Sequence, residues 1–221
     1  MDSQKLYLGL DPSLNGYGMV VLDGAGKLVD YKLIHSGHKL TKKLMKDVAE
    51  DEHLEKIDLD ECKKSSLIDA HRLTAFEVFI SEVYEEYPNI CGVAIEGYSH
   101  GSVGRVFQLG EIGGITRVAA YKRGITFIEV PPTTLKKFAT GKGNADKIQI
   151  AFAMNKGYGI DFSGYTKSDN LFDAYALARF AYLFFALEDM NQDDIDLISK
   201  SELDSVNKYI TDHFSTEANE I

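Results

Sequence analysis

The sequence contains few cysteines and no long apolar run. Only two of its 221 residues are cysteines, Cys62 and Cys91, and they form neither a CxxC motif nor a set typical of a metal site. Such sparse cysteine usage fits a reducing, intracellular setting. No apolar stretch approaches the length needed to span a bilayer, and residues 1–15 lack the basic start and apolar core of a signal peptide. We therefore expect a soluble, cytoplasmic protein that has no membrane partner.

Basic residues are scarce as well. The 24 Lys and Arg side chains are outnumbered by 34 Asp and Glu, so the net charge is −10, a balance that argues against a nucleic-acid partner. The charge is unevenly spread, however, because residues 188–221 carry −8 and residues 1–187 carry only −2. Residues 117–150 carry +5. The acidic average therefore hides one basic segment.

The pattern of apolar residues predicts an α/β fold. Hydrophobic residues make up 44% of the chain, and its length suits one folded domain. Residues 5–35 contain three short strands, and the turns between them are so short that the strands must be antiparallel neighbours. A helix over 65–87, a strand over 91–98, a helix over 108–123 and a strand over 125–132 follow, and helices complete the chain.

This order predicts a mixed five-stranded sheet, made of an antiparallel three-strand meander and parallel strands, with helices on both faces. It is the order of elements in the ribonuclease H-like fold. We expect this domain to occupy residues 1–187 and to carry a charged surface insertion, with some helix, at residues 36–64. Residues 188–221 are expected to form an acidic C-terminal extension.

Four acidic residues lie where these elements meet. Asp11 ends the first strand and Glu96 ends the fourth, and neighbouring strand ends in an open α/β sheet form a natural crevice for a site. Asp169 and Asp173 lie four residues apart at the start of the last long helix, so both occupy one helical face. Carboxylates that converge beside an apolar sheet repel each other unless a cation neutralises them. Oxygen ligands without His or Cys indicate Mg²⁺ or Mn²⁺.

This arrangement would suit two-metal hydrolysis of a phosphodiester. Two ions about 3.5–4 Å apart can activate a water and stabilise the leaving oxygen. We expect Asp11 to lie between two Mg²⁺ ions, with Mn²⁺ as a substitute, Glu96 and Asp173 to hold one ion each, and Asp169 to support or share one. Each acid also has an ordinary interpretation: Asp11 as a turn former, Asp169 as a helix cap and Asp173 on a solvated face. The prediction depends on their joint placement.

With these residues placed, the chain resembles the RuvC family of Holliday-junction resolvases. The resemblance covers roughly residues 5–35 and 90–185 and leaves out the insertion and the acidic tail. Five stretches carry it: "LGLDPSLNGYG", "VAIEGY", "QLGEIGGITRVAA", "VPPTTLKKFATGKGNADKIQI" and "DNLFDAYALA". The fourth, with its proline, its basic residues and its TGxGxAxKxQ run, is the most specific.

The resemblance implies a homodimeric, divalent-metal-dependent nuclease that nicks four-way DNA junctions symmetrically, with the glycine-containing helix at the dimer interface. It implies that Asp11, Glu96 and Asp173 are catalytic and that Lys147 lies near the scissile phosphate. One position departs from the family pattern, in which the paired acids are three apart: Asn170 occupies that place, and Asp169 precedes it. Whether Asp169 or Asn170 fills the fourth ligand position stays open. The insertion and tail are unlike the compact bacterial enzymes, and a phage or viral member is one interpretation.

Contacts to DNA are expected from two segments. Lys136, Lys137 and Lys142 cluster with Lys147 in the basic segment, where they would contact phosphates or, alternatively, form a solvated helix face. The glycine-rich loop after Glu96 carries three further candidates, Tyr98, His100 and Arg105. In this interpretation an aromatic ring of that loop inserts at an opened base step; an ordinary surface loop is the alternative.

Three other functions fit parts of the pattern. An actin-like ATPase or a phosphotransferase with the related kinase fold also opens with a strand, an Asp and a glycine-rich hairpin, although the chain is short for a two-domain enzyme of that class and shows no second phosphate loop. A binding protein that has lost cleavage is a second alternative. A nuclease for other branched DNA or for RNA–DNA hybrids is the third.

Overall fold

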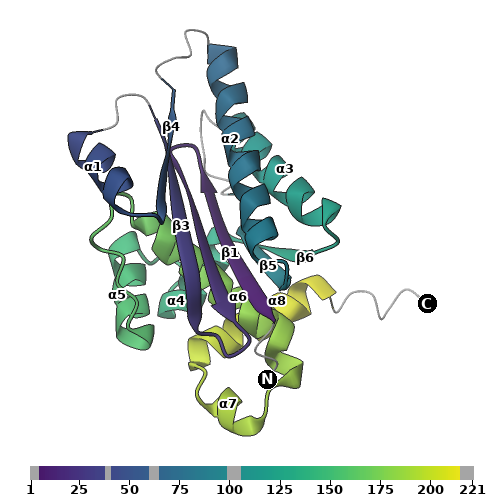
Figure 1. The fold of residues 1–221 in the computed structure, drawn as a ribbon. Helices are drawn as coiled ribbons and strands as arrows, with labels where there is room; N and C mark the ends of the chain where they lie inside the picture. Colours follow the sequence, from purple (N-terminus) through teal and green to yellow (C-terminus); the bar gives the residue numbers. More distant parts are fainter. Residues whose placement is uncertain (1–4, 38–40, 60–64, 99–105, 215–221) are drawn as a thin grey trace.

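A computed structural model describes residues 5–37, 41–59, 65–98 and 106–214. Its centre is a mixed sheet of six strands in the order β4-β3-β2-β1-β5-β6 (Figure 1). The strands are β1 (Leu6–Ser13), β2 (Gly16–Asp23), β3 (Leu28–Gly37), β4 (Leu54–Asp58), β5 (Ile90–Glu96) and β6 (Thr126–Val130).

The strand pairing confirms the predicted ribonuclease H-like sheet. β1, β2 and β3 form the antiparallel meander, β5 pairs parallel with β1, and β6 pairs parallel with β5. The predicted number of five strands was wrong, because β4 arises within the charged insertion and pairs parallel with β3. Its five residues are too few, and too mixed in charge, for a clear alternation of apolar side chains, although Leu54 and Ile57 are buried.

Helices cover both faces of the sheet (Figure 1). They are α1 (Lys42–Glu50), α2 (Ser65–Glu86), α3 (Val106–Lys122), α4 (Pro132–Thr140), α5 (Lys147–Tyr158), α6 (Asp169–Ala186), α7 (Gln192–Asp196) and α8 (Lys200–Phe214), with a 3₁₀ turn at Leu187–Asp189. α2 and α3 pack on one face, and α6 with α4, α5 and α8 packs on the other. Within the described residues, no helix combines the length and the apolar character that crossing a bilayer would require.

Alternation along β1 and β5 decides which face each acid occupies. Leu8 and Leu10 of β1 pack in the core under α2 and α3, whereas Tyr7 packs in the core under α6. Because successive side chains of a strand point to opposite faces, Asp11 shares the α6 side with Tyr7. By the same parity Glu96 follows Ala94, which packs under α6. Both acids therefore point toward the helix that carries the other two.

Glycines allow α6 to lie unusually close to the sheet. A Cβ atom at Gly9 would lie 2.0 Å from the carbonyl oxygen of Ala174, and one at Gly18 would lie 2.4 Å from that of Asn170. Such contacts are impossible for any side chain, so β1 and β2 can approach the α6 backbone only where they carry glycine. This close approach brings the start of α6 against the end of β1.

Substituting Gly9 is therefore expected to destabilise the fold. Gly9→Ala should lower the free energy of unfolding by about 1–3 kcal/mol or more, because the added methyl group overpacks the contact between β1 and α6. Chemical denaturation monitored by circular dichroism measures this change. Gly157→Ala is the control, since a Cβ there meets open space, and this helical site should gain up to about 1 kcal/mol. Equal stability of the two variants would contradict the close packing.

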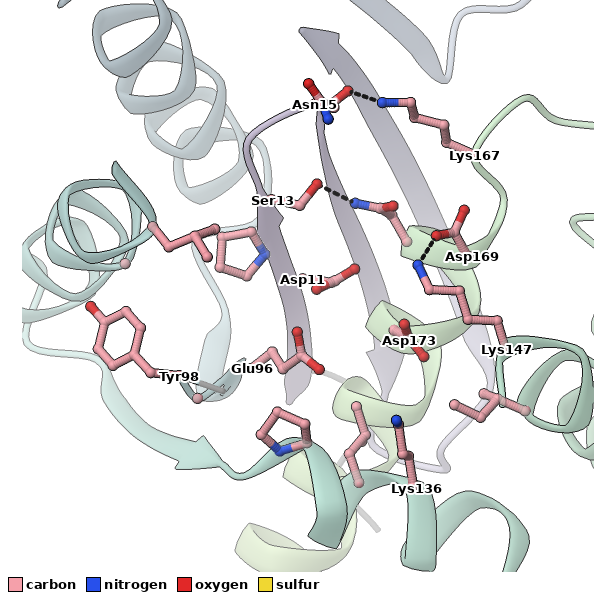
Figure 2. A pocket seen from close by; sticks show the side chains of 18 residues that line it. Asp11, Ser13, Asn15, Glu96, Tyr98, Lys136, Lys147, Lys167, Asp169 and Asp173 are labelled. Carbon is pink, nitrogen blue, oxygen red and sulfur yellow. Dashed lines mark hydrogen bonds and ion pairs between the residues drawn. The ribbon is translucent and has the colours of Figure 1, made fainter. Parts of the chain in front are cut away.

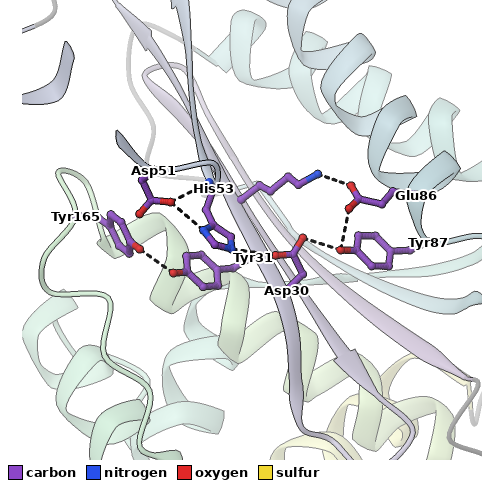
Figure 3. Close-up of polar contacts among 8 residues, drawn as sticks. Asp30, Tyr31, Asp51, His53, Glu86, Tyr87 and Tyr165 are labelled. Atoms are coloured by element: carbon purple, nitrogen blue, oxygen red, sulfur yellow. Dashed lines mark hydrogen bonds and ion pairs between the residues drawn. The ribbon is translucent and has the colours of Figure 1, made fainter. Parts of the chain in front are cut away.

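A polar network attaches the insertion to the sheet (Figure 3). Asp51 Oδ1 lies 2.8 Å from Nδ1 of His53, and Nε2 of His53 lies 3.5 Å from Oδ1 of Asp30 on β3. The His53 ring stacks on Tyr31, with 4.4 Å between ring centroids. The Tyr31 hydroxyl lies 2.7 Å from that of Tyr165, in the segment between α5 and α6. Tyr31 of β3 thus links the insertion to the segment that leads into α6.

The acidic tail contributes to the packed core. α8 packs against α4 and α6, and Val206 is fully buried. The Tyr209 hydroxyl donates a hydrogen bond of 2.8 Å to the carbonyl oxygen of Glu129 in β6. The division into a domain and an extension stays a prediction. α8 packs on α4, the helix that precedes the TGKG sequence of residues 140–143.

Candidate active site

A cavity of about 500 Å³ opens at the ends of β1 and β5, between α3, α4, α5 and α6. Its lining combines acids and lysines from distant parts of the chain (Figure 2). These include the four predicted acids and two of the predicted lysines: Asp11, Glu96, Asp169, Asp173, Lys136 and Lys147. The structure therefore brings all five residues predicted to be catalytic into one cavity.

Three of the acids face a shared space. Asp11 comes from β1, Glu96 from the end of β5 and Asp173 from the second turn of α6. Their carboxylates point toward one another in Figure 2. Asp11 is 5% exposed, and carboxylates are almost never buried to that extent unless they are paired.

Burial opposes the ionisation of all three acids, and for Asp11 and Asp173 the charges of neighbouring acids oppose it further. Burial and the nearby charges of Glu96 and Asp173 raise the pKa of Asp11 well above its ordinary value. Burial also raises the pKa of Glu96, although its hydrogen bond with Asp11 and the charge of Lys147 act in the other direction. Burial and the charge of Glu96 raise the pKa of Asp173 to about 7. A bound cation would therefore stabilise the ionised form of these acids.

Divalent cations fit this set of donors. The oxygens are hard ligands, and neither His nor Cys is among the residues that line the cavity. Within the described residues, however, no three His, Cys, Asp or Glu side chains stand arranged around one point as metal ligands do. Asp11 shares a hydrogen bond with Glu96, and Asp169 is paired with a lysine. The chemistry of the residues fits a metal, although their side chains are not arranged as a set of metal ligands.

Asp169 and Asn170 have different partners at the start of α6. Asp169 forms an ion pair with the ammonium group of Lys147, the first residue of α5. Asn170 is 5% exposed, and its Nδ2 donates to Oγ of Ser13 at 3.0 Å and to the carbonyl oxygen of Gly16 at 3.2 Å. Asn170 therefore clamps the turn between β1 and β2.

The structure adds Lys167 to the residues predicted from the sequence. Lys167 lines the cavity, and its ammonium donates 2.9 Å to the carbonyl oxygen of Asn15. Its backbone φ is +59°, in the left-handed region that residues other than glycine rarely adopt. Burial lowers the pKa of its ammonium group. No local pattern marked this lysine, because its importance comes from a contact with a turn more than 150 residues away.

Tyr98 lines the cavity on the side of α3. Its hydroxyl donates to the carbonyl oxygen of Gly110 at 3.2 Å and accepts a bond of 2.6 Å from Arg117. A Cβ at Gly113 would lie 2.5 Å from the same hydroxyl. Arg117 is itself paired with Glu129, at 3.3 Å. The ring is thus docked on α3 rather than extended toward the cavity mouth.

The other predicted DNA-binding residues are distributed differently. Lys136 lines the acidic cavity, whereas Lys137 is exposed on α4 and is not part of that lining. Lys142 lines a second cavity, of about 480 Å³, between α4, α5 and the start of α8. His100 and Arg105 lie outside the described residues.

Known proteins resemble this chain in sequence and in fold. The family model for crossover junction endodeoxyribonuclease RuvC matches residues 7–179. The enzyme of that name from Chlamydia muridarum is 30% identical over 109 residues, and that from Cytophaga hutchinsonii is 29% identical over 159 residues, which is 69% of this chain. In both cases the match spans 64% of the relative's own length.

Two solved structures share the fold. RuvC from Thermus thermophilus has a TM-score of 0.56 and 18% identity, over 80% of this chain and 94% of that one. The same protein in complex with a Holliday junction substrate has a TM-score of 0.56 and 19% identity, over 79% of this chain and 91% of that one. Since the family model covers the sheet, the four acids and most of α6, this chain belongs to the RuvC family of crossover junction endodeoxyribonucleases.

Proposed function

We propose that this protein is a divalent-metal-dependent endonuclease that nicks four-way DNA junctions. The observation that carries the proposal is the convergence of Asp11, Glu96 and Asp173 on one cavity, with the pKa of all three raised by burial and, for Asp11 and Asp173, also by the charges of neighbouring acids. Family membership supports a nuclease, and a solved relative is bound to a Holliday junction. Both favour DNA cleavage over an ATPase or kinase-like phosphotransferase.

Each residue of the cavity has a part in this chemistry. The carboxylates of Asp11, Glu96 and Asp173, with Asp169 as the fourth, would hold two Mg²⁺ ions, or Mn²⁺ in their place. When bound, such ions supply Lewis acidity that activates a water and stabilises the leaving oxygen of a phosphodiester.

The lysines would bind the substrate. Lys136 and Lys147 enter the cavity from α4 and α5, opposite the sheet. They would neutralise the DNA phosphate that is cleaved and hold it against the carboxylates. Lys137, Lys142, Tyr98, His100 and Arg105 are proposed as further DNA contacts outside this centre.

Synthetic substrates test the proposed function. Four-way, three-way and linear duplex DNA of matched sequence should be incubated with Mg²⁺, with Mn²⁺ and with EDTA, and the products separated on denaturing gels. We expect paired nicks at symmetric positions in the four-way junction, and none in EDTA. Cutting of linear duplex at the same rate would show that the protein is not selective for junctions. Preference for a three-way junction or an RNA–DNA hybrid would identify a different nucleic-acid substrate.

Symmetric nicking requires two active sites, and α3 offers a surface for a second copy of the chain. Its exposed face carries an apolar stripe at helical spacing, with Phe107 88% and Tyr121 79% exposed. Gly110 and Gly114 lie between them, where an added Cβ would meet open space. Exposed aromatic rings beside glycines allow close packing of a second helix. We therefore propose a homodimer with α3 at its twofold axis.

Charge on this stripe is expected to separate the dimer. Val118→Arg should convert the protein to a monomer at micromolar concentration, because two arginines would face each other across the axis. Sedimentation velocity measures the change. Val78→Arg on α2 is the control, since Val78 is 45% and Val118 is 49% exposed. A dimer that survives Val118→Arg, or one that Val78→Arg disrupts, would show that a different surface mediates association.

The site of action is proposed from the composition. Two cysteines without a CxxC motif fit the reducing environment of the cytoplasm. Junction DNA is the partner proposed there.

A further inference from the structure

Lys147 and Asp169 occupy a special place in the cavity. Lys147 begins α5, Asp169 begins α6, and their ion pair joins the two helices at the cavity (Figure 2). Burial lowers the pKa of Lys147, but its hydrogen bond and ion pair with Asp169 raise the pKa overall. The Lys147 ammonium is therefore paired with the Asp169 carboxylate in the structure.

Asp169 is the acid best placed to serve as a fourth ligand. It lies four residues before Asp173 on the same face of α6. Asn170 is held elsewhere, because both acceptors of its Nδ2 belong to the turn between β1 and β2. The Ser13 hydroxyl reinforces that turn by donating 2.7 Å to the carbonyl oxygen of Gly16. Because the side chain of Asn170 is held by this turn, the fourth ligand position is left to Asp169.

The Asp169 carboxylate can thus pair either with Lys147 or with a divalent cation. The lysine neutralises Asp169 with a single charge at a site where both side chains remain partly exposed, with 68% of the Lys147 side chain and 30% of the Asp169 side chain accessible. Ion pairs of that exposure are weak and exchange readily. A divalent cation drawn in by the other three acids would compete for the same oxygens with twice the charge.

We infer that Lys147 and a divalent cation compete for the Asp169 carboxylate, so that cation binding releases the Lys147 ammonium to contact a DNA phosphate. Lys147 then has two states: paired with Asp169 in the metal-free protein, and available to DNA once the cation is bound. The inference rests on the proposed function of this site and adds an order to its assembly, in which the metal precedes the lysine contact.

A double-mutant cycle on metal affinity tests the competition. Binding of Mn²⁺, without DNA, is measured by electron paramagnetic resonance in the wild type, Lys147→Met, Asp169→Asn and the double variant. Lys147→Met should bind Mn²⁺ about three- to fivefold more tightly than wild type, the size expected when a partly exposed ion pair no longer competes. In the Asp169→Asn background the same substitution should have a clearly smaller effect, because only the charge of Lys147 on the other acids remains to be removed.

Lys136→Met is the matched control for charge alone. Lys136 lines the same cavity, whereas the ion pair of Asp169 is made by Lys147. Its removal should change Mn²⁺ affinity equally with and without Asp169. If Lys147→Met behaves in this additive way, or leaves the affinity unchanged, the competition is absent even though the metal site stands. If no variant binds Mn²⁺, the metal-dependent function itself fails.

The salt dependence of junction binding tests the release of Lys147. In Ca²⁺, used as a divalent ion for the binding measurement, the slope of log affinity against log salt should be steeper for wild type than for Lys147→Met by about one, the value for one phosphate contact. In EDTA the two slopes should coincide. Slopes that differ equally in both conditions would show that Lys147 contacts DNA regardless of the cation and would overturn the inference.

Discussion

Asp11→Asn is expected to abolish strand nicking while the protein still binds four-way junctions. Asp11 is the most buried of the three acids that face the shared space, and its two neighbours both raise its pKa by their charge. The substitution keeps the size of the side chain but removes the charge that would hold the cations. Losing several kcal/mol of transition-state stabilisation corresponds to a drop of about 10³-fold or more in rate.

Rates of single-turnover cleavage and gel-shift affinities measure the two effects separately. Binding should persist, because the proposed phosphate contacts come from the lysines rather than from this acid. The fold should also persist, since a neutral amide replaces a carboxylate whose ionisation the site opposes. Asp204→Asn, an exposed position on α8, is the control and should cleave like wild type. Cleavage by Asp11→Asn within tenfold of wild type would mean that the chemistry occurs elsewhere.

Glu202→Ala is expected to cause the largest loss of stability. Glu202 is 3% exposed, and its Oε1 accepts a hydrogen bond of 3.2 Å from Nε of Arg179 and another from the Tyr158 hydroxyl. Arg179 is 8% exposed and stacks on the Tyr158 ring, with 4.4 Å from its central carbon to the ring centroid. Truncation would leave a buried guanidinium without its counter-charge, which costs about 3–5 kcal/mol.

Equilibrium denaturation of three variants tests this account. Asp204→Ala on the same helix should change the free energy of unfolding by about 0.5 kcal/mol at most, because the residue is exposed. Replacing both Arg179 and Glu202 by Met should cost less than Glu202→Ala alone, since no unpaired charge remains. If Glu202→Ala matches Asp204→Ala, α8 is only loosely attached to the core.

The stability of the Glu202 variants would show how much residues 188–221 contribute to the core, which the sequence did not indicate. Residues 188–221 carry a charge of −8 and were expected from the sequence only to form an acidic C-terminal extension, and the family model ends at residue 179. The structure instead places Glu202, Val206 and Tyr209 inside the protein. An acid at position 202 resembles the exposed acids around it until its partner, an arginine on α6, is known.

Much of the candidate site followed from local patterns. The apolar runs before Asp11 and Glu96 identified two buried strands, and the spacing of Asp169 and Asp173 put both on one helical face. The pairing of β1 with β5 then brought these acids to one edge, as the order of elements predicts. β4 was missed because its short segment carries both charges and apolar residues, so pairing with β3 rather than its own pattern makes it a strand.

The sequence by itself determined which side chains alternate toward α6, because periodicity along an element sets the direction of each side chain, and it placed Glu96 at the end of β5. The expectation that Asp11 ends the first strand was wrong, since pairing with β2 extends β1 to Ser13. The tertiary structure alone decided that α6 lies against Gly9 and Gly18, that Asn170 clamps a turn, and that Lys147 pairs with Asp169. These contacts join residues between 22 and more than 150 positions apart. Their distances depend on how closely whole elements pack, and no local pattern encodes that packing.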